Sequence, residues 1–290
     1  MKQIAIIGFG KLGSHLYYAL KRAGKYKIKP AIKHKSSKIR AQDFKYCNTI
    51  FICTEDSAIS SVVSTLLKSH INLRDRFVYH TSGTHSSELL LPLQKSGARI
   101  GSFHPVQTFE SIASKYSGRL KGIYVVIEGS RSAISEGQKI AKALGAKPIE
   151  LSRENKVLHH ICCVFASNYL VAHASQIERI AKAISTPTGS KKRLKNGFYN
   201  RNYFGIYKPL IEQTLSNINN KGIANSLTGP IERNDIKTIE LHLETLAKEL
   251  SGVLPYYVLL GIEAIDLALK KKSLDIQDAN KLMELMNRYM

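Results

Sequence analysis

The feature that most constrains the fold of this chain is a glycine-rich turn between a buried strand and a helix. Residues 3–7 form a continuous apolar run, as expected of a strand buried on both faces. Gly8, Gly10 and Gly13 follow at G-x-G-x-x-G spacing, and a helical pattern then continues to about Gly24. Gly8 permits the tight turn, Gly10 leaves room for a pyrophosphate, and Gly13 lets the helix pack on the strand. This order of strand, glycine turn and helix predicts a dinucleotide-binding unit with phosphates at the helix N-terminus. The alternative is a glycine turn without a ligand.

The end of the second predicted strand, at about residues 27–33, indicates which dinucleotide would bind. An NAD-specific chain has Asp or Glu about 20 residues after the turn, bound to the ribose 2′-hydroxyl. Residues 33–38 read Lys-His-Lys-Ser-Ser-Lys and contain no carboxylate. These donors suit a 2′-phosphate and predict NADP (NADPH); the alternative is a solvated lysine-rich turn. The predicted cofactor-binding residues come from the turn, this segment and two later strand ends: Gly8, Phe9, Gly10, Lys11, Leu12, Gly13, Lys33, His34, Lys35, Ser36, Thr54, Ser82 and Gly83.

Strand and helix patterns alternate up to about residue 150, and only helical patterns follow. This predicts an α/β fold, an N-terminal doubly wound Rossmann sheet followed by an all-α C-terminal domain. We expect an NADP-binding domain over 1–152 and a helical substrate and dimerisation domain over 153–290. The remaining strands are predicted at 49–53, 76–81, 99–103, 123–128 and 147–151, and the later helices at 57–69, 87–95, 132–144, 156–184, 207–221, 235–250, 254–270 and 275–289.

The chain carries a formal charge of +21, and most of this excess lies in two segments. Residues 1–54 contribute +11 and residues 185–208 contribute +6. The second segment mixes lysines with aromatic residues, a pattern that also suits single-stranded nucleic acid. Because the larger share surrounds the predicted phosphate site, we expect a small anionic ligand and consider nucleic acid unlikely. The four cysteines match no disulfide framework or zinc motif, so we expect no metal site and a reducing, cytoplasmic setting.

Four residues are candidates for catalysis. His104 precedes Pro105 directly after a predicted strand, which would aim its imidazole out of the sheet edge. His160 and Asn168 are eight residues apart, so two helical turns bring them near one face. Arg233 follows a Thr-Gly-Pro turn and could bind a carboxylate or phosphate. The plainer alternatives are a loop-packing His104, an internally satisfied His160 and Asn168, and an Arg233 paired with Asp235.

Four motifs together resemble an uncharacterised oxidoreductase family of the DUF2520 type. They are Ser82-Gly83, the His-Pro-x-Gln-x-Phe segment at 104–109, the helix from His160 to Asn168, and Leu-Thr-Gly-Pro-x-x-Arg-x-Asp at 227–235. The resemblance implies a Rossmann-like NADP-binding domain joined to a helical domain of unknown function. It extends loosely to 6-phosphogluconate dehydrogenase and pyrroline-carboxylate reductase, and implies no particular substrate. Asn234 departs from the pattern, since the family usually has Gly there, although Asn tolerates left-handed backbone.

The sequence therefore predicts an NADP(H)-dependent oxidoreductase, a reductase of a small anionic carbonyl or imine compound bound in the interdomain cleft. The alternative is a non-catalytic NADP-binding or redox-sensing protein. Long apolar helix faces, such as residues 253–269, predict a homodimer through the helical domain. We expect no membrane span, because no continuous apolar run reaches about 20 residues, and no signal peptide before the first strand.

Overall fold

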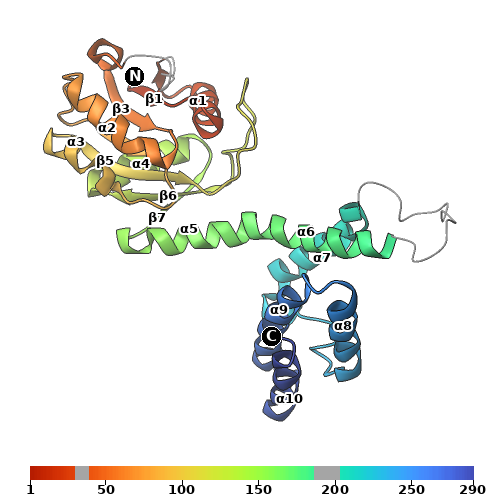
Figure 1. The fold of residues 1–290 in the computed structure, drawn as a ribbon. Helices are drawn as coiled ribbons and strands as arrows, with labels where there is room; N and C mark the ends of the chain where they lie inside the picture. Colours follow the sequence, from red (N-terminus) through yellow and green to blue (C-terminus); the bar gives the residue numbers. More distant parts are fainter. Residues whose placement is uncertain (30–38, 186–202) are drawn as a thin grey trace. The chain divides into compact units, whose positions relative to one another are not determined.

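The computed structural model describes residues 1–29, 39–185 and 203–290, which form two compact units, Met1–Tyr169 and Leu170–Met290 (Figure 1). Strands are confined to the first unit within these ranges. The predicted boundary after residue 152 marks where strands give way to helices. The compact units divide later, inside the long helical stretch, because the first part of that stretch packs with the sheet.

The first unit is built on one sheet of seven strands among the described residues, in the order β2-β1-β3-β4-β5-β6-β7. Neighbouring strands run parallel except β5 and β6, which are antiparallel. The predicted α/β fold with a mostly parallel sheet is therefore confirmed. The strands are β1 (Gln3–Ile7), β2 (Lys27–Ile28), β3 (Cys47–Ile52), β4 (Phe77–His80), β5 (Arg99–Pro105), β6 (Tyr124–Gly129) and β7 (Lys147–Glu150).

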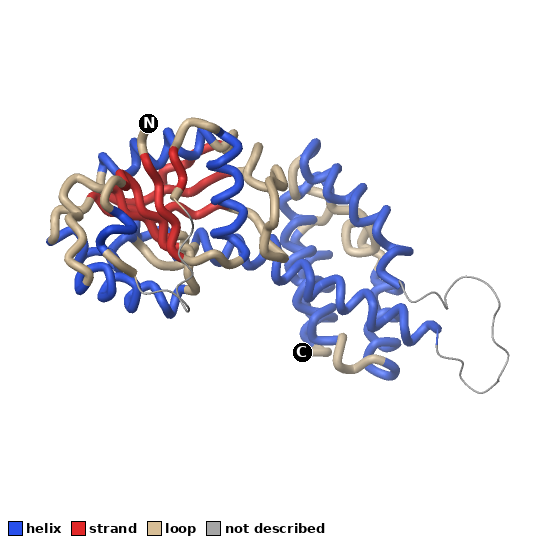
Figure 2. The backbone as a smooth tube through the Cα atoms, turned by 90° about the horizontal axis from the view of Figure 1, so that it is seen from above, coloured by secondary structure: helices blue, strands red, loops and turns tan. Residues whose placement is uncertain are grey.

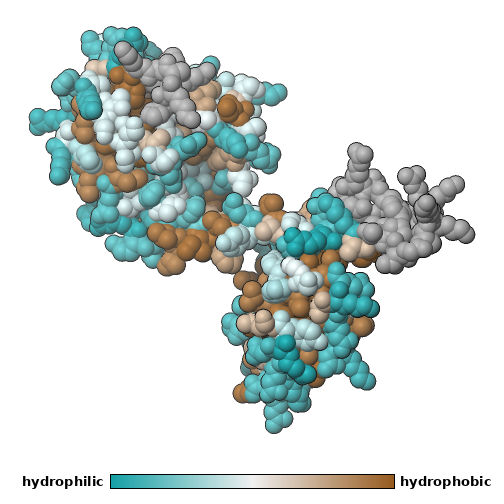
Figure 3. Space-filling model, viewed as in Figure 1, coloured by the Kyte–Doolittle hydropathy of each residue, from teal (hydrophilic) through white to brown (hydrophobic). Residues whose placement is uncertain are grey.

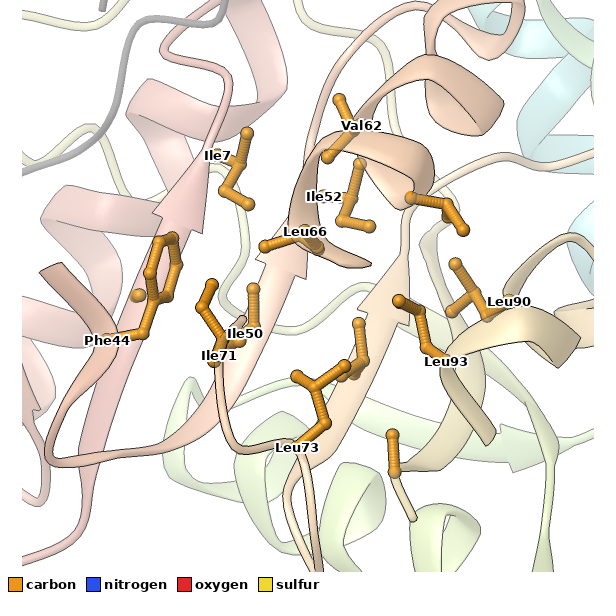
Figure 4. Packing of buried hydrophobic residues seen from close by; sticks show 14 of the residues in the cluster. Ile7, Phe44, Ile50, Ile52, Val62, Leu66, Ile71, Leu73, Leu90 and Leu93 are labelled. Atoms are coloured by element: carbon orange, nitrogen blue, oxygen red, sulfur yellow. The ribbon is translucent and has the colours of Figure 1, made fainter. Parts of the chain in front are cut away.

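Helices cover both faces of this sheet (Figure 2). Alternate residues of one strand point to opposite faces, so Ile7 joins one core cluster and Ile6 the other. The first cluster packs β3 and β4 against α2 and the segment around α3 (Figure 4). The second packs the other face against α1 and α4. These helices are α1 (Lys11–Ala23), α2 (Ile59–Lys68), α3 (Leu91–Lys95) and α4 (Arg131–Ala143), with short 3-10 turns at Ala41–Phe44, Asp56–Ala58, Ser87–Leu90 and Arg153–Asn155.

The strand order reverses at β1, which lies between β2 and β3. The chain therefore leaves β1 toward one side and returns to β3 on the other, and ligands of doubly wound sheets bind at such a point. The turn after β1 and the segment after β3 meet here. A Cβ added at Gly8 would lie 2.6 Å from the carbonyl oxygen of Cys53.

The connection between β5 and β6 is a long loop that packs back onto α1. The backbone N–H of Ala113 donates to the Ser14 hydroxyl at 2.8 Å. Nδ1 of the buried His15 lies 2.7 Å from the Ser117 hydroxyl, and the His15 ring packs at a tilt against the Phe109 ring. The first turns of α1 thus hold the segment that follows His104.

The second unit consists of helices in its described residues. α8 (Ile236–Glu249), α9 (Leu254–Lys271) and α10 (Ile276–Asn287) share a buried core that includes Leu243, Ile265 and Leu282. Gly261 lets α9 approach Met286 of α10, because an added Cβ would lie 2.6 Å from its methyl carbon. The predicted all-α C-terminal part is confirmed. Its other helices are α6 (Leu170–Ser185) and α7 (Tyr203–Lys221), with a 3-10 turn at Ala224–Ser226.

One helical stretch, Arg153–Ile184, joins the two units and departs from a regular α-helix. α5 (Lys156–Val164) is followed by a π turn (Phe165–Tyr169) and then by α6. In the described residues, this stretch alone is long and apolar enough to cross a membrane by length and composition. Histidines and serines interrupt the apolar residues of this stretch. The expectation of no membrane span rests on continuous apolar runs only, and it therefore does not detect this stretch. Figure 3 shows hydrophobic surface where α5 lies.

Candidate active site

The glycine turn has the geometry of a phosphate cradle. Gly8 has a φ of 96°, a conformation that glycine adopts readily. A Cβ at Gly13 would lie only 2.0 Å from the Gly8 carbonyl oxygen, so this position requires glycine for helix packing. A Cβ at Gly10 would meet nothing within 4 Å, so the space beside its backbone is open.

The first turn of α1 and Thr54 supply groups that could hold a dinucleotide here. Gly10 caps α1 without a side-chain hydrogen bond, and no acidic residue lies in the first turn. Free N–H groups at such a helix start favour an anion. The Thr54 hydroxyl is buried without a hydrogen-bond partner among the described residues. An orphaned polar atom beside an open glycine cradle fits a bound polar ligand. Phe9, Lys11 and Leu12 line the same turn.

The predicted 2′-phosphate residues Lys33, His34, Lys35 and Ser36 lie outside the described residues, as does most of the basic segment 185–208. Their roles stay predictions. The described part of the second strand is short, Lys27–Ile28, and pairs with β1 through Gln3 and Ile4.

Ser82 and Gly83 form the turn after β4, and the two residues make different contacts. The Ser82 hydroxyl donates to Asp56 at 2.7 Å and accepts from the backbone N–H groups of Thr84 and His85. Gly83 instead faces two imidazoles, since an added Cβ would lie 2.8 Å from His104 Nε2 and 2.7 Å from His160 Cδ2. The predicted residues Gly83, His104 and His160 are thus brought together, and Ser82 orders the turn.

Lys156, the first residue of α5, is buried at the same edge of the sheet. Its side chain is 1% exposed, and its ammonium donates to the Ser82 carbonyl oxygen at 3.0 Å and to the Ser102 hydroxyl at 2.8 Å. Burial lowers its pKa to about 8, while the carboxylates of Glu128 and Asp56 oppose that shift. Lys156 therefore anchors α5 to β5 and to the turn after β4, and it places a positive charge beside the imidazoles.

His104 and His159 form a hydrogen-bonded pair of imidazoles. His104 Nδ1 lies 3.2 Å from His159 Nε2, and the two rings meet edge to face. Cys163, one helical turn after His159, has its sulfur 3.7 Å from the same Nε2. Burial, the Lys156 charge and His159 together lower the pKa of His104 to about 3. Burial and then Lys156 also lower the pKa of His159, and burial raises the pKa of the Cys163 thiol. His104 is therefore a neutral imidazole at physiological pH.

Asn168 lies within the π turn and is exposed. Its side-chain oxygen accepts from the Ser167 hydroxyl at 2.9 Å. Eight residues span about 2.2 turns of a regular α-helix. A π turn contains an extra residue, so it rotates Asn168 back toward the face of His160. A direct role for Asn168 stays a prediction.

Arg233 lies in the second unit, on an exposed loop held by other residues. Lys271 bonds the Leu227 carbonyl oxygen and the Glu232 carboxylate, and Asp235 caps α8 through Thr238. Asp235 thus bonds Thr238 in the structure rather than Arg233. Asn234 has a φ of 53°, so this residue adopts the left-handed conformation that glycine would favour. The role of Arg233 in binding an anion stays a prediction.

Sequence reasoning missed Lys156, His159, Cys163 and Asp56. The partners of Lys156 are 74 and 54 residues away in sequence, so its burial depends on the tertiary fold. One local signal was present: a lysine at a helix start opposes the helix dipole, so it needs another reason to be there. A second signal was the His159-x-x-x-Cys163 spacing, which places two metal-binding side chains on one helix face.

A glycine cradle at the switch point of a Rossmann sheet, followed by a helical unit, defines the class of two-part dinucleotide-binding proteins. Within this class, residues 123–263 match the family described as "Domain of unknown function (DUF2520)". This match confirms the resemblance inferred from the motifs. A sequence search of the curated proteins finds no match.

Solved structures with the same fold include three that cover nearly the whole chain. BF3122 of Bacteroides fragilis, described as a candidate NADP oxidoreductase, is 20% identical with a TM-score of 0.65, covering 89% of this chain and 96% of its own. Protein TM1727 from Thermotoga maritima is 23% identical with a TM-score of 0.66, covering 93% and 99%. A reductive aminase from Aspergillus terreus, in complex with NADPH and ethyl-5-oxohexanoate, is 12% identical with a TM-score of 0.53, covering 99% and 93%. At these identities the likeness shows the shared fold, and it agrees with the predicted class.

Proposed function

We propose that the chain is an NADP(H)-dependent oxidoreductase that reduces a small anionic carbonyl or imine compound. One observation carries the proposal: the glycine cradle after β1 and the imidazole cluster at the end of β5 share one edge of the same sheet. Cofactor and proton-transfer groups therefore belong to one rigid unit. The NADPH complex of the reductive aminase supports the choice of cofactor, as does the basic composition of residues 33–38.

The glycine cradle after β1 and the side chain of Thr54 would hold the cofactor. Backbone N–H groups of the first turn of α1 would bind the pyrophosphate, and the Thr54 hydroxyl, which has no hydrogen-bond partner among the described residues, would be available to bond the cofactor. When bound, the nicotinamide supplies the hydride that reduces the substrate carbon. The protein must then deliver one proton to the carbonyl oxygen or imine nitrogen.

The His104–His159 pair is arranged to deliver that proton. With His159 Nε2–H donating to His104 Nδ1, the proton of His104 sits on Nε2, the nitrogen that faces Gly83. His104 gives this proton to the substrate while its Nδ1 takes the proton of His159. His159 is only half-buried, so it can recover a proton from solvent. Each imidazole ends the transfer neutral, and this suits the buried position of His104.

The first experiment measures cofactor binding and turnover separately. NADPH and NADH are titrated by fluorescence, and NADPH oxidation is screened with carboxylate-bearing ketones and cyclic imines. We expect tighter binding of NADPH and oxidation with at least one member of the panel. Binding without oxidation across the panel would favour the non-catalytic NADP-binding alternative, and preference for NADH would contradict the assigned cofactor.

The relay is tested with His159→Gln and the matched control His70→Asn, which changes an exposed histidine of the same unit. We expect kcat to fall about 100-fold in His159→Gln, the lower range for general acid catalysis. NADPH affinity should stay unchanged, and added imidazole should restore part of the rate. An unchanged kcat would remove His159 from the mechanism.

We also propose that a second copy of the chain covers the exposed apolar residues of the helical stretch. Phe165 and Val171 are 63% and 71% exposed, and a groove of about 480 Å³ between α6 and α7 is lined mainly by apolar side chains. Large exposed apolar patches mark interaction surfaces. Sedimentation should show a dimer that Val171→Glu converts to a monomer; a monomeric wild type at micromolar concentration would refute this.

A further inference from the structure

The imidazole pair and Cys163 form a cluster of metal-ligand atoms. His104 Nδ1, His159 Nε2 and Cys163 Sγ all lie within 4.8 Å of one another. His104 lies at the end of β5, and the other two residues lie one turn apart on α5. Because a strand and a helix hold all three, the cluster is formed before any ion arrives.

The distances match those of a tetrahedral zinc site. With Zn–N bonds of about 2.05 Å and a Zn–S bond of about 2.3 Å, tetrahedral angles place the two nitrogens about 3.3 Å apart. The same geometry places nitrogen and sulfur about 3.6 Å apart. The structure has 3.2 Å between His104 Nδ1 and His159 Nε2, and 3.7 Å between His159 Nε2 and Cys163 Sγ. Two of the three ligand spacings thus need little adjustment.

The chemistry of the donor set also favours Zn²⁺. Imidazole and thiolate are the ligands that zinc prefers, and three protein ligands leave one position for water or another ligand. The positive charge of Lys156 opposes a cation here. A thiolate at Cys163 supplies a compensating negative charge in direct contact with the metal.

We propose that His104, His159 and Cys163 form a Zn²⁺ site, and that zinc bound there stops the proton relay. The second half rests on the proposed function. Zinc takes His104 Nδ1 and His159 Nε2, the two nitrogens between which the relay proton passes. The imidazole pair therefore either transfers a proton or binds a metal, and free zinc would regulate turnover.

Zinc binding changes where the protons of the cluster lie. The Cys163 thiol loses its proton to solvent as the Zn–S bond forms. The proton on His159 Nε2 moves to Nδ1 of the same ring, and His104 keeps its proton on Nε2. One proton is released, both imidazoles stay neutral, and no redox step occurs.

The site is tested with Co²⁺ as a spectroscopic probe and Zn²⁺ as competitor. We expect wild-type protein to show a thiolate-to-cobalt charge-transfer band and tetrahedral d–d bands, both abolished by Zn²⁺. Cys163→Ser should lose the charge-transfer band and bind Zn²⁺ at least about 100-fold more weakly, because even outer-shell partners cost up to that factor. The matched control is Cys162→Ser, which changes the exposed neighbour and should bind like wild type.

The cobalt and zinc binding measurements need no substrate. They therefore test whether the metal site exists even if the proposed activity is not found. Absence of a charge-transfer band in folded wild type, or equal loss in Cys162→Ser, would overturn the site. His159→Gln is a second ligand variant, and its circular dichroism shows whether it is folded. Where turnover is measurable, zinc should inhibit wild type and Cys162→Ser but not Cys163→Ser. Bound zinc with unchanged turnover would overturn the regulatory half.

Discussion

Replacing Lys156 with methionine should change how stability depends on pH. The methionine side chain fills a similar volume but carries no proton. In the wild type, burial lowers the pKa of Lys156 from 10.5 to about 8. The unfolded chain therefore binds more protons than the folded chain between these values, and stability rises with pH there. Below pH 8, where the buried amine is charged, the full free-energy cost of burying that charge lowers the stability of the fold.

The size of the effect follows from the pKa difference. At about 1.4 kcal/mol for each tenfold change in proton affinity, the charged amine destabilises the fold by about 3 kcal/mol. Between pH 7.5 and 9.5, about 2 kcal/mol of this penalty is relieved. The methionine thioether does not titrate, so Lys156→Met does not show this rise in stability with pH. The hydrogen bonds to Ser82 and Ser102 are lost at every pH and do not affect the slope.

The assay is urea unfolding with pulse labelling of the buried Cys53, read by mass spectrometry, which follows the sheet unit alone. The stability difference between wild type and Lys156→Met should change by about 2 kcal/mol from pH 7.5 to 9.5. Lys142→Met changes an exposed lysine of α4 and should give a constant difference. A constant difference for Lys156→Met as well would refute the lowered pKa.

Three further predictions concern backbone positions. Gly13→Ala should destabilise the sheet unit by about 1–3 kcal/mol in urea unfolding, because its Cβ would overlap the Gly8 carbonyl oxygen. Gly10→Ala should stay within about 0.5 kcal/mol of wild type but weaken NADPH binding at least about tenfold in titration; normal binding would contradict the phosphate cradle. Asn234→Ala should be about 1–2 kcal/mol less stable than Asn234→Gly, because its φ of 53° is unfavourable for a residue with a Cβ. Equal stability of these two variants would show that the loop relaxes.

The sheet could be predicted because its strands are marked locally. Residues 3–7 are continuously apolar and end at a glycine turn, and a glycine stands two residues before each of β5, β6 and β7. The antiparallel pairing of β5 and β6 was not predictable from these patterns, since it depends on how the long loop between them packs on α1.

The candidate site was predictable where one element or one turn carries the signal. His104 and Gly83 end neighbouring strands, so their approach follows from a parallel sheet. The environment of His104 was not predictable, because Lys156 and His159 reach it from a helix over 50 residues later. The π turn was equally hidden, since its sequence reads as ordinary helix.

The loop after β5 has a thermodynamic consequence. It begins at the strand that carries His104 and is tied to α1 at Ser14 and His15, just after the glycine turn. We therefore expect ligand occupancy at the turn to alter substrate affinity near His104 through this shared segment. Linkage requires the effect to be mutual: substrate must change cofactor affinity by the same factor. The strength of this coupling would then be a property of the loop.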